Sequence, residues 1–326
     1  MIAPETAGDP MSDQKWVRSS LRHLSTRLAE LGHRASPPTV RRLLRKLEYS
    51  LKANRKERET GSAHPERDAQ FMHIEEQKQD HREAHMPIIS VDTKKKDLIG
   101  DFKNAGRDWC QDAELVKVHD FPSEALGRSV PYGVYDLERN RGYVRVGTSA
   151  DTPPFAVEAI RAWWETEGAG AYPTAEGLLI LADGGGSNGW RPRVWKQQLQ
   201  EQLCDRFGLT VTVCHYPTGC SKWNPVEHRL FGPISLNWAG HPLRTWETML
   251  AYLRGTTTET GLSVTAELHE AVYQKGQKVS NAEMAQLNLE PHQVCPQWNY
   301  TLRPRSPTAT HGPALSARQV ISCTPL

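Results

Sequence analysis

The spacing of apolar residues divides the chain into two parts with different periodicity. Near the N-terminus, apolar residues recur every three or four positions in two successive stretches, "KWVRSSLRHLSTRLAELG" and "HRASPPTVRRLLRKLEYS". This spacing predicts two amphipathic helices, the first ending at Gly32 and the second beginning between Ser36 and Pro38. The positions expected on the buried faces are Val17, Leu21, Leu24, Leu28 and Leu31 in the first helix, and Val40, Leu43, Leu44 and Leu47 in the second.

From residue 86 onward, short apolar runs alternate with longer amphipathic stretches. The short runs predict strands in "PIISVDTK", "YGVYDLE", "GYVRVGT", "GLLILAD" and "LTVTVCHYP", and the second and third form a hairpin around "RNRG". The longer stretches predict helices in "TPPFAVEAIRAWWETEG", "RPRVWKQQLQEQLCDRFG" and "NPVEHRLFGPISLNW". This order predicts an α/β fold with a mixed sheet. It matches the ribonuclease H-like architecture, in which a central sheet carries acidic residues at neighbouring strand ends.

These patterns predict a modular chain. We expect residues 1–60 to form a helix-turn-helix DNA-binding region, 61–85 a charged linker or exposed helix, 86–305 the catalytic domain with an insertion near 97–131, and 306–326 a loose tail. Two short helices joined by a tight turn are the defining feature of a helix-turn-helix.

Charge is distributed unevenly along the chain. The formal net charge is only +2, yet residues 15–59 hold thirteen Lys or Arg against four Glu. The second predicted helix presents four of these cations on its outer face, namely Arg41, Arg42, Arg45 and Lys46. A basic helix after a tight turn is typical of a recognition helix that enters the major groove of DNA. A solvated pair of helices with basic faces is the alternative interpretation.

Composition excludes several classes of protein. A hydrophobic fraction of 38% with ten Trp is enough for a packed core, so wholesale disorder is not expected. No apolar run approaches the roughly 18 residues of a membrane helix, and the N-terminus lacks the apolar core of a signal peptide. We therefore expect a soluble, cytoplasmic, nucleoid-associated protein without a membrane partner. The six cysteines lack zinc-site spacing and are expected to be reduced thiols.

Three carboxylates follow predicted strands. Asp92 ends the first strand, Asp183 ends a later one, and Glu227 lies at a helix start just after the last strand. Strand termini are where an α/β sheet usually displays its chemistry. Three converging carboxylates repel unless cations neutralise them, and hard oxygen ligands suit two Mg²⁺ or Mn²⁺ ions acting on a phosphodiester. Isolated acids at strand ends are also common, which leaves a purely structural interpretation open.

The residues around these acids have two interpretations each. The loop "GGGSNGW" after Asp183 lacks the Gly-Lys-Ser/Thr ending of a phosphate-binding loop, so its glycines are expected either to admit substrate beside a metal ligand or to form a plain turn. Secondary candidates for contact with a scissile phosphate or with DNA are His215, Lys222, Asn188 and Asn224. The basic segment Thr93 to Lys96 is a further candidate for the DNA backbone. Structural or solvated roles are the alternatives for all of them.

Several longer segments resemble one known family. They are "IISVDTKKKDLIGDFKNAGR", "VHDFP", "PYGVYD", "LADGGGSNG", "CHYPTGCSKWNPVEHRLF" and "WNYTLRPR", and the chain that carries them resembles the Rhodopirellula-type DDE transposases of bacterial insertion sequences from about Pro4 to Arg305. The resemblance implies a ribonuclease H-like catalytic domain behind a DNA-binding region. It also implies an acidic triad at Asp92, Asp183 and Glu227. Similar chains carry a further N-terminal helical region, so a shortened N-terminal region is expected.

The function that follows is DNA strand cleavage at an element's end and strand transfer into a target, both phosphoryl displacements served by the same metal pair. The expected partners are the element's terminal repeats, target DNA and further copies of the chain assembled on DNA. Two alternatives remain. One is a shortened, catalytically inactive transposase that only binds element ends, and the other is a ribonuclease H-like nuclease, which would have no need of the basic helix pair.

Overall fold

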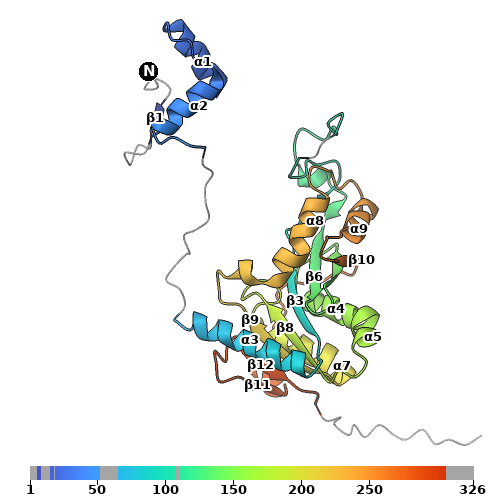
Figure 1. The fold of residues 1–326 in the computed structure, drawn as a ribbon. Helices are drawn as coiled ribbons and strands as arrows, with labels where there is room; N and C mark the ends of the chain where they lie inside the picture. Colours follow the sequence, from blue (N-terminus) through green and yellow to red (C-terminus); the bar gives the residue numbers. More distant parts are fainter. Residues whose placement is uncertain (1–5, 9–14, 18, 52–64, 108–109, 306–326) are drawn as a thin grey trace, which may run out of the picture. The chain divides into compact units, whose positions relative to one another are not determined.

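The computed structural model describes residues 6–8, 15–17, 19–51, 65–107 and 110–305. The chain divides into two compact units, residues 1–59 and residues 60–326, and each is described by itself (Figure 1). The expected tail 306–326 lies outside the described residues. None of the helices in the described ranges combines the length and the apolar character needed to cross a membrane.

The first unit contains a short antiparallel strand pair, β1 (Thr6–Gly8) and β2 (Lys15–Val17), and two helices, α1 (Leu21–Glu30) and α2 (Pro37–Lys46). Helix α1 begins where Ser20 Oγ accepts a hydrogen bond from the His23 amide, and two prolines open α2. The predicted helices are confirmed as elements. The first begins later than expected, because Val17 lies in β2.

A small core joins the two helices of this unit. Leu24, Leu28 and Val40 are buried against one another. The expectation that Leu31, Leu43 and Leu47 are buried is wrong, since they are 61%, 40% and 57% exposed. Two ten-residue helices can cover only one narrow stripe of each other, and these three leucines lie outside that stripe. Arg41, Arg42, Arg45 and Lys46 are exposed on α2, as expected.

The second unit is built on an eight-stranded mixed sheet, which confirms the predicted α/β class. Its strands are β3 (Ile88–Thr93), β6 (Val130–Asp136), β7 (Arg141–Gly147), β8 (Gly177–Ala182), β9 (Thr210–His215), β10 (Ser263–His269), β11 (Leu289–Pro291) and β12 (Asn299–Leu302). The order across the sheet is β10-β7-β6-β3-β8-β9-β12-β11. The pairs β3–β8, β8–β9 and β7–β10 are parallel and the others antiparallel. All five predicted strands are present, while β10, β11 and β12 were not predicted.

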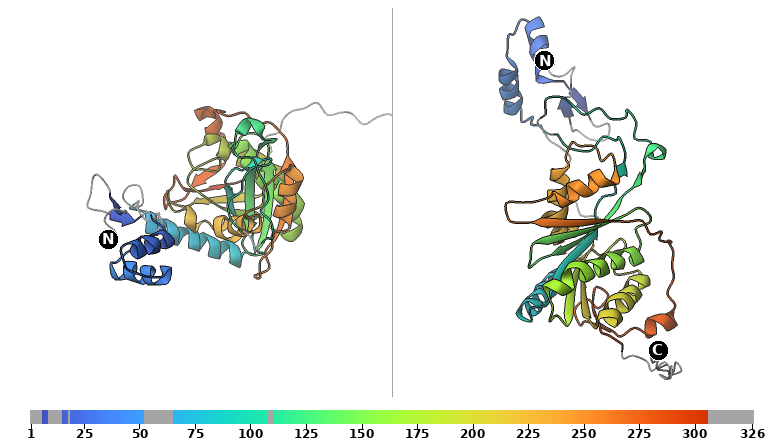
Figure 2. Two further views of the ribbon diagram at one scale, coloured as in Figure 1. Left: turned by 90° about the horizontal axis from the view of Figure 1, so that it is seen from above. Right: turned by 90° about the vertical axis from the view of Figure 1, so that its right-hand side faces the viewer.

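Helical segments cover both faces of the sheet (Figure 2). On one face lie α4 (Pro153–Trp163), continued by a π-helical turn η3 (Trp164–Gly168) and α5 (Ala169–Ala171), and α6 (Arg193–Leu199), continued by η4 (Gln200–Cys204) and α7 (Asp205–Phe207). On the other lie α3 (Arg67–Glu83), the π-helical turn η6 (Glu227–Phe231), α8 (Gly232–Asn237) and α9 (Trp246–Arg254). Successive strand residues point to opposite faces, so Ile89 belongs to the first core and Ile88 to the second. The central strands are apolar on both faces for this reason.

The segment expected to be a charged linker or an exposed helix contains helix α3, and one face of this helix is buried. Ile74 and Gln70 on α3 are fully buried, and His73 is nearly so. Ile74 packs with Leu179 and Leu181 of β8. The sequence hides this contact because two of the buried positions are polar and are satisfied by hydrogen bonds, which weakens the apolar periodicity.

The remaining elements are small. Strand β4 (Leu98–Ile99) pairs antiparallel with β5 (Gly127–Arg128), and η2 (Pro122–Glu124) lies between them in the sequence. Helix α10 (Asn281–Ala285) starts with a capping box formed by Ser280 and Glu283. The five cysteines in the described ranges form no disulfide with one another, and four of them are buried.

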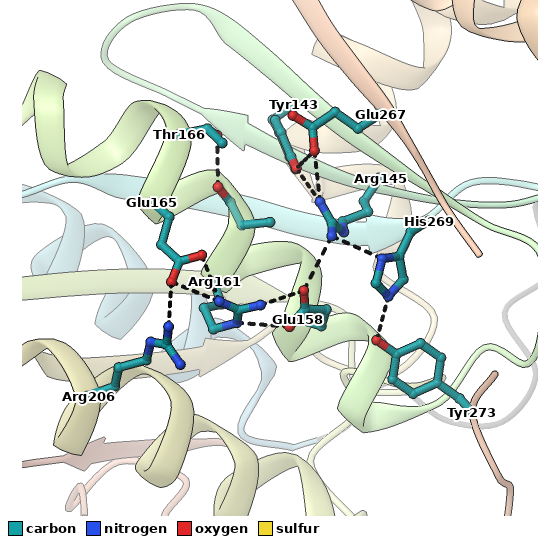
Figure 3. Close-up of polar contacts among 11 residues, drawn as sticks. Tyr143, Arg145, Glu158, Arg161, Glu165, Thr166, Arg206, Glu267, His269 and Tyr273 are labelled. Carbon is teal, nitrogen blue, oxygen red and sulfur yellow. Dashed lines mark hydrogen bonds and ion pairs between the residues drawn. The ribbon is translucent and has the colours of Figure 1, made fainter. Parts of the chain in front are cut away.

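An ion-pair network fastens the edge strand β10 to its neighbours (Figure 3). Arg145 on β7 donates hydrogen bonds to Glu267 Oε2 at 2.8 Å, to His269 Nδ1 at 3.0 Å and to Glu158 Oε1 at 3.3 Å. Glu158 on α4 also accepts from Arg161. One guanidinium therefore connects β7, β10 and α4.

Candidate active site

Two of the predicted carboxylates lie side by side at one edge of the sheet. Strands β3 and β8 run parallel, and Val91 is paired with Ala182. The next residue on each strand path is Asp92 and Asp183, respectively. Because the carboxyl ends of parallel strands meet at the same edge, the register itself makes these two acids neighbours.

The third carboxylate, Glu227, opens the turn η6, and hydrogen bonds tie its segment to β3. Ser90 Oγ accepts from the Val226 amide at 2.9 Å and donates to Asn224 Oδ1 at 2.5 Å. Asn224 Nδ2 in turn donates to Asp183 Oδ1 at 3.1 Å and to the Val91 carbonyl at 3.3 Å. Asn224 is therefore the clamp that holds this segment, β3 and Asp183 together. Ser90 was not predicted, because a serine inside an apolar strand carries no signal of its own.

The three carboxylates influence one another electrostatically. Burial, together with the charges of Asp183 and Glu227, raises the pKa of Asp92 to about 8. Burial raises the pKa of Asp183 to about 6, with the Asn224 hydrogen bond opposing the rise and Glu227 adding to it. These shifts mark a site whose negative charge lacks compensation.

The donor set fits a divalent cation. Within the described ranges, no three His, Cys, Asp or Glu side chains lie close enough together to hold a metal ion as they stand, so the three acids are neighbours rather than a closed cage. Repulsion between the carboxylates keeps them apart, and a bound dication would draw them closer together. Hard oxygen donors without a lysine or arginine partner suit Mg²⁺ or Mn²⁺.

A fourth acid, Asp151, stands beside this group. Thr93 Oγ1 donates to Asp151 Oδ1 at 3.2 Å, and Lys96 Nζ lies 2.9 Å from Asp151 Oδ2. Its charge also contributes to the raised pKa of Asp92. Sequence reasoning missed Asp151, although β7 runs parallel to β3 and ends four residues before it, which was an available signal.

A depression of about 450 Å³ opens at Asp92, and its lining is basic. The lining residues are Asp92, Thr93, Lys94, Lys95, Lys96, Arg128, Asp151 and Gly186. Lys94 is buried, with Nζ 3.7 Å from Asp97 Oδ2 and 4.5 Å from the centre of the Trp238 ring, and burial lowers its pKa. Lys95 and Arg128 are exposed. Cations therefore border the acidic site on this side.

The glycines of the loop after Asp183 differ from one another in backbone conformation and in the space around them. Positive φ occurs only at Gly186, at +73°. An added Cβ would meet nothing within 4 Å at Gly185, would lie 3.2 Å from the Tyr216 carbonyl oxygen at Gly184, and would lie 3.0 Å from the loop backbone at Gly189. Gly185 is thus the position that the fold itself leaves open, whereas Gly189 is required by close packing.

The secondary candidates have different surroundings. His215 is fully buried, its Nδ1 lies 3.0 Å from the Asp183 carbonyl oxygen, and burial lowers its pKa to about 4. Both ring nitrogens have partners within the fold, the Asp183 carbonyl and the Tyr300 hydroxyl, which fits the structural role given as the alternative for His215. Asn188 is also fully buried, and its amide makes no hydrogen bond with the described residues. Lys222 is exposed, 5.7 Å from the Trp223 ring centre, so its role stays a prediction.

The family described as "Rhodopirellula transposase DDE domain" matches residues 1–304. Among solved structures, "Crystal structure of the Mos1 mariner paired end complex with Mn" shares 13% identity with a TM-score of 0.43, over 72% of this chain and 65% of that one. "Crystal structure of the Mos1 Strand Transfer Complex" shares 12% identity with the same TM-score, over 75% and 72%.

A third structure is "Mos1 transposase paired-end complex with left transposon end", and the chain spans 65% of its length. These structural similarities are too distant to support an argument about function. A search of curated proteins gives no match. The family match stands on its own, since it covers nearly the whole chain and includes every carboxylate of the site. The chain belongs to the Rhodopirellula transposase DDE domain family.

Proposed function

We propose that this chain is an insertion-sequence transposase that cleaves a DNA strand at the element's end and transfers it to a target. The observation that carries the proposal is the placement of Asp92 and Asp183 at adjacent strand ends, with Glu227 tied to the same strands through Asn224. The sheet supports a ribonuclease H-like fold. Strands β7-β6-β3-β8-β9 have the order 3-2-1-4-5, with the first three antiparallel and the last three parallel.

Asp92, Asp183 and Glu227 are the residues that would hold two Mg²⁺ or Mn²⁺ ions. Such ions, when bound, activate an attacking oxygen and stabilise the leaving oxygen of a phosphodiester. The chain's own residues prepare the acids for this role. Asn224 engages Asp183 Oδ1, and the Ser90 hydroxyl fixes the backbone of Val226, next to Glu227. The Asp183 carboxylate and the backbone next to Glu227 are thereby held in place before metal arrives, which reduces the entropy lost on binding.

The basic lining of the depression beside Asp92 suits the DNA backbone. Lys94, Lys95 and Arg128 place positive charge next to the acids, where phosphates must approach. Gly186 of the glycine loop lines the same depression, and its neighbour Gly185 leaves open space. The chain thus offers cations and an open loop beside the carboxylates, where the reacting phosphate would lie.

The N-terminal unit would supply sequence recognition. Arg41, Arg42, Arg45 and Lys46 are exposed on α2, which follows α1 after a short turn, and this is the arrangement of a recognition helix. The partners proposed are the element's terminal repeats, target DNA and further copies of the chain assembled on DNA in the nucleoid.

A cleavage and joining assay on the cognate element ends tests this function. With Mg²⁺, the full chain should release the 3′ end and join it to target DNA. The Asp183→Asn variant should bind the ends with unchanged affinity but neither cut nor join. Binding without cleavage by the unmodified chain would instead support the inactive, end-binding alternative. Cleavage of unrelated DNA or RNA without joining would support a ribonuclease H-like nuclease.

A further inference from the structure

A network of buried hydrogen bonds runs from helix α3 to the backbone of Asp183. It starts at Gln70, whose side chain is fully buried. Gln70 Nε2 donates to the His215 carbonyl oxygen at 2.8 Å and to Asn299 Oδ1 at 2.7 Å. Asn299 Nδ2 donates back to Gln70 Oε1 at 2.6 Å. Each of the two side-chain amides therefore donates to the oxygen of the other, and together they join α3 to β9 and β12.

His215 carries this network to the site. The Asp183 carbonyl oxygen, 3.0 Å from His215 Nδ1, can only accept, so Nδ1 bears the proton. His215 Nε2 is then the acceptor facing the Tyr300 hydroxyl at 3.4 Å. The Tyr300 oxygen already accepts from Trp195 Nε1 at 2.9 Å, which leaves its own proton directed to the ring. Partners on both nitrogens fix the tautomer and the orientation of this imidazole.

Asp183 needs such support because of its place in the chain. Strand β8 ends at Ala182, and three glycines follow Asp183, so regular structure ends immediately before it. Its carboxylate is held by Asn224, while its carbonyl is held by His215. Without the second contact, the main chain of Asp183 would be anchored on one side only.

We propose that Gln70 and His215 are positioning residues, which hold the Asp183 backbone so that its carboxylate can bind a catalytic metal ion. This inference rests on the proposed function, because it takes Asp183 as a metal ligand. Gln70 acts only through His215 and touches neither metal nor DNA. A shift of about 1 Å at such a ligand is enough to cost on the order of a hundredfold in rate.

A matched variant separates positioning from general support of the core. His73 lies on the same helix, is 8% exposed, and bonds through Nε2 to His292 Nδ1 at 2.8 Å. The His292 side chain bonds onward to Thr301 and its backbone amide donates to the Asn299 carbonyl, so no chain of side-chain hydrogen bonds among the described residues leads from His73 to Asp183. Gln70→Ala and His73→Ala each remove one buried polar side chain from α3. Both should lower the thermal midpoint, but only the first should disturb the site.

The experiment measures Mn²⁺ binding and end cleavage on the full chain. For Gln70→Ala we expect about a tenfold higher Mn²⁺ concentration for half-saturation and at least a tenfold lower cleavage rate, with DNA affinity unchanged. For His73→Ala we expect both values to stay within twofold of the unmodified chain. Equal shifts in the two variants, or no shift in Gln70→Ala, would overturn the positioning role. Asp183→Asn is the reference, since unchanged Mn²⁺ binding by that variant would overturn the metal site itself and with it the proposed function.

Discussion

Single residues set the charge of the site, and the pKa of Asp92 is raised further than that of Asp183. The pKa of Asp92 rises from the ordinary 3.8 to about 8, chiefly because of burial. The folded state therefore binds a proton at Asp92 more tightly than the unfolded state does, and this contribution to stability is lost as the pH rises from about 4 to about 8. The sequence predicted Asp92 and Asp183 as site residues because both follow apolar strands, and the register of these two strands makes the two acids neighbours. The burial of His215 was not predictable, since β12 covers it from a distant part of the chain.

Replacing Asp92 with Asn should stabilise the metal-free protein at high pH. In EDTA, the thermal midpoint of Asp92→Asn minus that of the unmodified chain should increase between pH 5 and pH 8, by an amount corresponding to about 1 kcal/mol or more. Above pH 8 this difference should stay constant. Cleavage should be abolished at every pH. A difference in midpoint that does not change with pH would show that Asp92 is not perturbed in this way.

The glycine loop offers a second test at this scale. An Ala side chain at Gly185 meets no neighbour, whereas at Gly189 its Cβ lies 3.0 Å from backbone. If DNA approaches the loop, Gly185→Ala should leave the thermal midpoint unchanged and lower the cleavage rate about tenfold or more, in line with the cost of small displacements at a reacting centre. Gly189→Ala should instead lower the midpoint. Normal cleavage by Gly185→Ala would indicate that the glycines serve only the turn.

At the scale of elements, sequence patterns located the long, regular pieces and missed those that depend on distant partners. The five predicted strands, β3, β6, β7, β8 and β9, stand out because the central ones are apolar on both faces. Strand β10 is half polar, and the presence of Glu267 in a strand is explained by its ion pair with Arg145 on the neighbouring strand. The sequence of helix α3 looks like a linker because its buried positions include polar residues. Gln70 is tolerated in the core because its side chain bonds to the distant Asn299.

Removal of Arg145 should loosen β10. Arg145 is 14% exposed and pairs with Glu158 and Glu267 across three elements (Figure 3). Arg145→Ala therefore removes the cation from Glu267 and leaves Glu158 with Arg161 as its remaining ion-pair partner among the described residues. We expect a loss of about 2 to 3 kcal/mol in the free energy of unfolding by urea. Arg206 is the matched control, because it is 50% exposed and pairs only with Glu165 among the described ion pairs. Arg206→Ala should cost less than about 1 kcal/mol, and equal losses in the two variants would contradict the network's role.

At the scale of the whole molecule, the chain combines a basic N-terminal unit with an acidic site on the sheet. Arg41 and Arg42 are exposed on α2, and the sequence identified them because charge excess does not depend on tertiary contacts. The extent of the exposed apolar surface on the first unit was not predictable, because it depends on how much of α2 the helix α1 can cover.

The double variant Arg41→Ala/Arg42→Ala should weaken binding to element ends. If both residues contact phosphates, the slope of log affinity against log salt should fall by about two, and a base contact by either should cost about 1 to 3 kcal/mol. Arg22→Ala, an exposed change on α1, should leave discrimination between cognate and unrelated DNA unchanged. Unaltered affinity and salt dependence in the double variant would place DNA recognition elsewhere.

The position of β12 in the sheet has a consequence for the order of synthesis. Strand β12 pairs with β9, and its Asn299 and Tyr300 complete the surroundings of Gln70 and His215. All three carboxylates leave the ribosome more than seventy residues before these two side chains do. A nascent or prematurely terminated chain therefore carries every acid of the site without the frame that steadies Asp183. Under the proposed function, a chain that lacks β12 should therefore bind the metal ions weakly and cut poorly.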